Sequence, residues 1–91
     1  MEKINHIFKD IIEKYHLKDD FNRFQAMKIF KEIIGEKMAN KILEIKIRHK
    51  ILIVKFSSPS LKNDFIYKTN DILEQINRQI GEKVINNIAI I

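Results

Sequence analysis

Residues 42–56 read ILEIKIRHKILIVKF, and the other predicted elements are arranged around this segment. Its first half alternates charged residues with aliphatic ones, namely Leu43, Ile45 and Ile47. This is the pattern of a strand with one buried face. The run from 51 to 56 is rich in β-branched residues, as strands are. The two runs stand two residues apart, so the segment predicts a β-hairpin.

The sequence on both sides of the hairpin has helical spacing. Apolar residues recur every three or four positions over 2–16, 21–34 and 59–80, which predicts three helices. The last eight residues, 84–91, are β-prone and predict a closing third strand. The expected architecture is therefore α+β in the order α-α-β-β-α-β, a three-stranded sheet with helices packed on one face. We expect a single domain over residues 1–91.

Short signals mark where the helices begin and end. Gly35 and Gly81 follow two of the apolar patterns and suit the left-handed position after a helix. Ser58 followed by Pro59 is typical of a helix start, because serine caps and proline needs no donor there. Asp19 or Asp20 is the expected cap of the second helix.

The second strand of the hairpin is apolar on both sides. Leu52, Val54 and Phe56 alternate with Ile51 and Ile53. Two interpretations remain open. Either the helix over 2–16 covers the second face, or Ile51 and Ile53 are partly exposed and mark a surface for a partner.

Positive charge is concentrated on the hairpin. The chain has a net charge of +5, and residues 41–55 hold five cations against the single acid Glu44, which leaves +4 there. The five cations are Lys41, Lys46, Arg48, Lys50 and Lys55. A clustered positive field favours nucleic acid or an acidic protein surface as partner. The alternative is that these charges only protect an exposed strand from edge pairing.

The composition excludes several classes of protein. The chain has no cysteine, so disulfides and thiolate metal sites are excluded and a reducing cytoplasm is the expected compartment. The N-terminus does not resemble a secretory leader, and no apolar run is long enough to span a bilayer. His6, His16 and His49 have no partners at metal-ligand or catalytic spacing. We therefore expect no enzyme activity, no cofactor and no membrane partner.

One fragment resembles a nucleic-acid-binding motif. The run 33–38, Ile-Ile-Gly-Glu-Lys-Met, is similar to the Ile-Gly-x-x-Gly core of KH domains, whose loop presents backbone donors to phosphates. The second glycine is Met38 in this chain, and its side chain would obstruct a close approach of the backbone. The resemblance thus supports a KH-like fold more than it supports a phosphate clamp.

An ordered set of residues resembles the DciA-like family of bacterial proteins, long treated as a domain of unknown function. The likeness covers residues 24–91. It rests on an aromatic residue followed by two aliphatic residues and a glycine, then on a strand, on serines before a helix, and on a closing strand. The residues that carry it are Phe30, Ile33, Ile34, Gly35, Leu52, Val54, Ser57, Ser58, Leu61, Phe65, Ile72, Leu73, Ile76, Asn77, Ile80, Gly81 and 84–88. The family's hairpin turn usually has a glycine where this chain has Lys50.

This resemblance implies a KH-like fold and a protein that binds the DnaB-type replicative helicase and helps to place it on single-stranded DNA. It implies no ATP hydrolysis by the chain itself. On this interpretation the five hairpin cations contact DNA or an acidic surface of the helicase. Two alternatives remain: an RNA-binding or ribosome-associated KH-like module, and a structural homodimeric adaptor that uses the face of Ile51 and Ile53.

Overall fold

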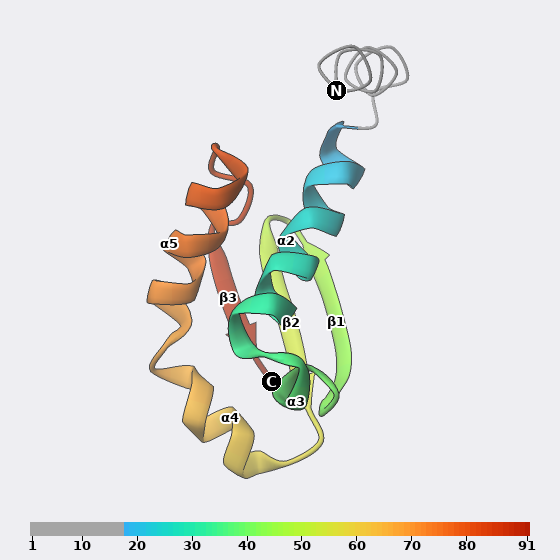
Figure 1. Ribbon diagram of the computed structural model, residues 1–91, viewed down its shortest axis with the longest axis vertical. Coiled ribbons are helices and arrows are strands. Elements are labelled where there is room, and N and C mark those ends of the chain that lie inside the picture. Colours follow the sequence, from blue (N-terminus) through green and yellow to red (C-terminus); the bar gives the residue numbers. More distant parts are fainter. Residues whose placement is uncertain (1–17) are drawn as a thin grey trace.

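The structure is a computed structural model that describes residues 18–91, so the helix predicted over residues 2–16 lies outside the described part. Figure 1 shows helices on one side of a small sheet. The elements in chain order are α2 (Lys18–Ile34), α3 (Glu36–Ala39), β1 (Ile42–Arg48), β2 (Ile51–Phe56), α4 (Pro59–Ile66), α5 (Thr69–Ile80) and β3 (Asn87–Ile90). The predicted α+β class, the hairpin and the closing strand are confirmed.

The sheet has the order β1-β2-β3, with β2 in the centre. β1 is antiparallel to β2, and β3 is parallel to β2. In Figure 1 both β2 and β3 run downward behind the helices, and β3 lies to the left of β2. The connection through α4 and α5 is therefore right-handed, as expected for two parallel strands in one sheet.

The core lies between the helices and one face of the sheet, which we call the inner face. Leu52 and Val54 of β2 are fully buried there, and Ile88 and Ile90 of β3 lie beside them. The helices contribute the facing layer, with Ala26, Ile29, Phe30, Leu61, Ile72 and Ile76. Sheet and helices together thus bury the apolar stripes that the sequence pattern predicts.

Residues 59–80 form two helices, so the prediction of one continuous helix there was wrong. The break falls at Tyr67 and Lys68, which cap α4 and α5 respectively. α4 packs against β2 and β3, whereas α5 packs against α2 and β3. The phenyl ring of Phe65 stacks on Phe56, with 5.2 Å between the ring centroids. The bend lets each half of the segment follow its own packing partner.

Leu43 was expected on the buried face of β1 but is 65% exposed. The pairing of β1 with β2 shifts between Ile42 and Glu44, a β-bulge that adds one residue to β1. Ile42 therefore pairs with Phe56 in its place, and Ile45 still pairs with Val54. The bulge locally reverses the alternation of buried and exposed side chains along β1. No residue type in the sequence of this segment predicts it.

The predicted helix ends are largely confirmed. Ser58 accepts a hydrogen bond from the backbone N–H of Ser60 at 3.2 Å and precedes Pro59 at the start of α4. Gly81 is left-handed as predicted, with φ 92° and ψ 4°. Gly35 has a positive φ of 89° but a ψ of 157°, so it lies outside the predicted left-handed helical region. Asp19 and Asp20, by contrast, lie within the first turn of α2 and do not precede it.

Candidate nucleic-acid interface

The predicted binding residues divide between one face of the sheet and its two ends. Side chains that alternate with the buried ones along β1 and β2 point to the side away from the helices, which we call the outer face. Its residues are Glu44, Lys46, Arg48, Ile51, Ile53, Lys55, Asn87 and Ala89, as the strand register requires. Three of the five predicted cations are therefore brought together on one surface.

On the outer face each cation of β1 lies opposite an isoleucine of β2. Lys46 pairs with Ile53, and Arg48 pairs with Ile51. Directly opposite residues in an antiparallel pair have side chains in contact distance. Ile51 and Ile53 are only half-buried, so part of each side chain remains accessible to a ligand. The outer face thus combines an apolar centre with a margin of cations.

Among the described residues the outer face has a single acid, Glu44, which lies opposite Lys55. Its carboxylate forms an ion pair with Lys46 at 3.0 Å, and both side chains are close to half exposed. Such a surface pair contributes little to stability. Within residues 18–91, Arg48 and Lys55 have no ion-pair partner, so their charges remain available to a ligand.

Lys41 and Lys50 lie at opposite ends of β1, outside the outer face. The carbonyl of Lys41 accepts a hydrogen bond at 2.9 Å from the N–H of Ser57, which puts Lys41 beside the start of α4. Lys50 is in the two-residue turn of the hairpin with His49, and both have positive φ, at 62° and 51°. Two positive φ values define a type I′ turn, whose twist suits a hairpin. Its backbone thus takes the conformation that glycine adopts most easily.

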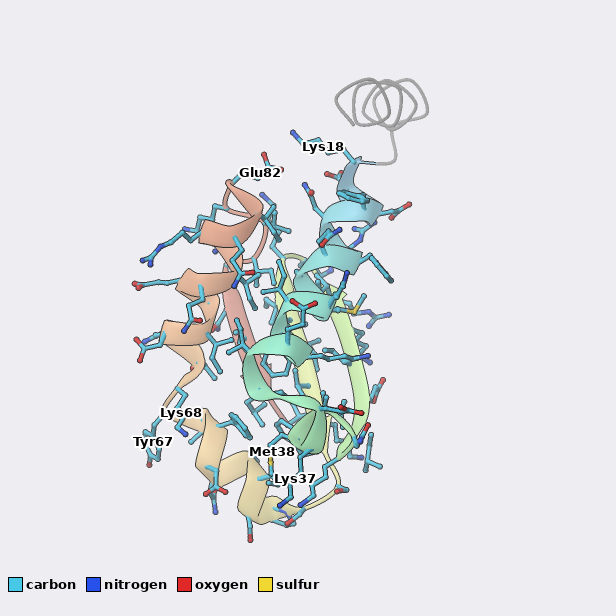
Figure 2. All side chains as sticks on the ribbon, viewed as in Figure 1. Lys18, Lys37, Met38, Tyr67, Lys68 and Glu82 are labelled. Carbon is cyan, nitrogen blue, oxygen red and sulfur yellow. The ribbon has the colours of Figure 1, made fainter. Side chains whose placement is uncertain are left out.

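A polar cleft of about 670 Å³ lies at the end of the molecule where Lys50 is found. α2, the hairpin turn and the segment after α5 line it. Glu82 bridges the cleft, because it accepts a hydrogen bond at 2.6 Å from Asn22 and forms an ion pair at 3.4 Å with Lys18. Figure 2 shows Lys18 and Glu82 reaching toward each other. Sequence reasoning missed this contact, since 60 residues separate Asn22 from Glu82.

The KH-like fragment does not form an open phosphate-binding loop. Gly35 ends α2, with its N–H donating to the carbonyl of Lys31 at 3.0 Å, and residues 36–39 form α3 directly afterwards. Met38 is half-buried and packs against the core, near Lys37 in Figure 2. The side chain of Met38 is thus part of the packing, and Gly35 serves to end a helix.

Asn77 has a structural role that explains its place in the sequence pattern. Its side-chain oxygen accepts hydrogen bonds from the N–H groups of Val84 and Ile85, at 3.0 and 3.1 Å. Its amide group donates to the carbonyl of Ile85 at 2.9 Å. These three bonds hold the segment that leads from α5 into β3, because they satisfy backbone groups that no strand pairs.

The described residues carry no arrangement typical of a metal site or a membrane segment. Within residues 18–91 no group of three metal-ligating side chains comes together. The helices of that range are each too short or too polar to cross a bilayer. His49 lies in the hairpin turn, while His6 and His16 belong to the undescribed residues.

Comparison with known proteins identifies the family. The family model described as Dna[CI] antecedent, DciA, matches residues 3–90, which extends the likeness of residues 24–91 to nearly the whole chain. Neither the curated proteins nor the solved structures include a match. The chain therefore belongs to the DciA family, which relates it to loading of the replicative helicase in DNA replication.

Proposed function

We propose that this chain is a non-enzymatic accessory protein that binds single-stranded DNA through its outer face and assists loading of a DnaB-type replicative helicase. The observation that carries the proposal is the register of the hairpin. It gathers Lys46, Arg48 and Lys55 around two partly exposed isoleucines. Family membership supports the link to the helicase, and the DciA family is not a known family of enzymes.

The chemistry of the outer face suits a flexible, single-stranded ligand. Cations bind the phosphates, while the aliphatic surface of Ile51 and Ile53 offers contact to unstacked bases. Lys41 and Lys50 extend the line of charge beyond both ends of β1, so five cations follow one ribbon. A strand of seven residues spans roughly 20 Å, about the length of three to four nucleotides of extended chain.

Equilibrium binding of a fluorescent oligothymidine tests the proposal. The variant carries Lys46→Glu, Arg48→Glu and Lys55→Glu. The matched control carries Lys28→Glu, Lys31→Glu and Arg78→Glu, three exposed cations on α2 and α5 that give the same change of net charge. We expect the outer-face variant to lose at least roughly tenfold in affinity, because three attractive interactions with phosphate become repulsive. Equal losses in both variants would mean that only net charge matters, and the outer face would then not be the binding surface.

A second assay addresses the helicase. The purified chain is immobilised and exposed to the purified DnaB-type helicase, with the same two variants. We expect both variants to retain the helicase. The outer-face variant could instead lose the helicase and keep full affinity for DNA. The outer face would then bind an acidic surface of the helicase, and the proposal that it binds DNA would be wrong.

Competition with structured RNA separates the remaining alternative. A DNA-binding accessory protein prefers oligothymidine over a duplex RNA hairpin of equal charge, because its ligand must be unstacked. A preference for the hairpin at the same salt concentration would favour an RNA-binding or ribosome-associated module.

A further inference from the structure

Tyr67, at the junction of α4 and α5, is the most exposed of the large apolar or aromatic side chains in the described residues. Its side chain is 91% exposed, and within residues 18–91 its hydroxyl has no hydrogen-bond partner. Figure 2 shows Tyr67 at the outside of the molecule, with Lys68 beside it. The fold therefore gains nothing from the ring of Tyr67, which leaves the ring free for a ligand.

Two hydrogen bonds and a cation–π contact hold the turn that carries Tyr67. The N–H of Lys68 donates to the carbonyl of Phe65 at 2.9 Å, and the Thr69 hydroxyl donates to the carbonyl of Ile66 at 3.3 Å. The Lys68 ammonium lies 5.7 Å from the centre of the Phe65 ring, a cation–π contact. Because the hydrogen bonds hold the backbone of the turn, little backbone entropy is lost when Tyr67 binds.

Tyr67 can be reached from the proposed DNA-binding ribbon. Lys41, at one end of that ribbon, lies beside the start of α4 through its hydrogen bond with Ser57. α4 has eight residues and is about 12 Å long, so about two nucleotides of extended chain span the helix from its start to the Tyr67 end. Lys62 lies on α4 between them, and Lys68 follows Tyr67 directly.

We propose that Tyr67 is a base-stacking residue for single-stranded nucleic acid, with Lys68 beside it to bind a phosphate of the same strand. This inference rests on the proposed function and extends it to the helical side of the molecule. A single exposed ring next to a cation offers one π face, which is enough for one base. It is far smaller than the roughly 800 Å² per partner that a stable protein interface buries.

Tyrosine fluorescence provides a direct test, because the chain has two tyrosines and no tryptophan. In a Tyr15→Phe background Tyr67 is the only tyrosine. We expect oligothymidine to quench its emission, with the same midpoint as the anisotropy of the labelled oligonucleotide. Tyr67→Phe retains the affinity, and Tyr67→Ser lowers it by roughly 5- to 150-fold, the range measured for one base stacked on an aromatic ring.

Two controls separate stacking from general effects. Phe24→Ser removes another exposed aromatic side chain, 61% exposed on α2, and leaves the affinity unchanged. The salt dependence of binding stays the same in Tyr67→Ser, because a stacked ring neutralises no phosphate. Circular dichroism confirms that the variant is folded.

The outcomes distinguish the inference from the proposed function. Tight binding of oligothymidine by the wild-type chain, with neither quenching nor an effect of Tyr67→Ser, overturns the inference alone. No binding by the wild-type chain overturns the proposed function, and the inference with it. Loss of helicase binding but not of DNA binding in Tyr67→Ser assigns the ring to a protein contact and also overturns the inference.

Discussion

The two faces of the sheet both carry aliphatic residues of β2, but these residues are buried to different degrees. Along β2, Leu52 and Val54 of the inner face are fully buried, whereas Ile51 and Ile53 of the outer face are half-buried. The neighbouring β1 follows the same division, with Ile45 and Ile47 inside and the cations outside. Within residues 18–91 the inner face alone supplies buried residues of the sheet to the core, so the outer face can carry charge.

This division follows from the period of two in a strand. Each residue of β2 is committed to one face, so a substitution at one position affects either the core or the outer surface. The bulge at Leu43 is the exception, because it moves one aliphatic side chain from the inner side to solvent. Substitutions on the two faces should therefore differ in effect, most of all at the centre of β2.

Leu52→Ala is expected to lower the free energy of unfolding by about 2–5 kcal/mol, since it leaves a cavity in a fully buried site. Ile53→Ala, the next residue on the other face, is expected to cost less than half as much. Urea denaturation followed by circular dichroism measures both. If the two variants are destabilised equally, the outer face contributes as much to stability as the inner face, and the difference between the two faces is wrong.

Asn77→Ala is expected to lower the free energy of unfolding by about 2–3 kcal/mol, because it removes three partly buried hydrogen bonds. Asn77→Asp keeps both accepted hydrogen bonds but replaces the donated one by repulsion between a carboxylate oxygen and the Ile85 carbonyl, so any stability that it retains over Asn77→Ala measures the two accepted bonds. The same denaturation assay applies. Equal stability of Asn77→Ala and the wild type would show that the segment before β3 is held by packing alone.

Lys50→Gly is expected to raise the free energy of unfolding by about 1 kcal/mol. Lys50 has a φ of 62°, a conformation that costs an L-residue energy and that glycine adopts freely. The thermal midpoint should therefore rise, and the hairpin turn loses one of the five predicted cations. A lower midpoint would mean that the Lys50 side chain stabilises the turn by contacts of its own.

If the outer face binds nucleic acid and not a second copy of the chain, as we propose, Ile53→Lys changes neither the sedimentation coefficient nor the fold. Analytical ultracentrifugation over a range of concentrations measures this. Self-association of the wild type that disappears in Ile53→Lys, with circular dichroism unchanged, would favour the homodimeric adaptor.

Much of the fold could be predicted because it rests on local periodicity. The alternation over 42–56 and the helical spacing over 21–34 each report which side of an element is buried. Phe30, the aromatic residue of the family pattern, is fully buried as an apolar stripe requires. Ser58 and Gly81 were predictable for the same reason, since caps act on neighbours in the chain.

Other features depend on contacts that no local pattern reveals. The division of residues 59–80 at Tyr67 reflects different packing partners for α4 and α5, although the apolar spacing continues through it. The contact of Asn22 with Glu82 joins elements at opposite ends of the described chain. Of the candidate site, the sequence predicted the cations, but only the register distinguishes Lys46, Arg48 and Lys55 from Lys41 and Lys50.

The salt dependence of binding to oligothymidine shows whether the outer face binds phosphate. The wild type is compared with the variant that carries Lys46→Gln, Arg48→Gln and Lys55→Gln. The slope of log K against log salt concentration falls by roughly 0.7 for each phosphate that the protein no longer neutralises, so we expect a decrease of about 2. An unchanged slope in the folded variant would mean that the outer face binds no phosphate.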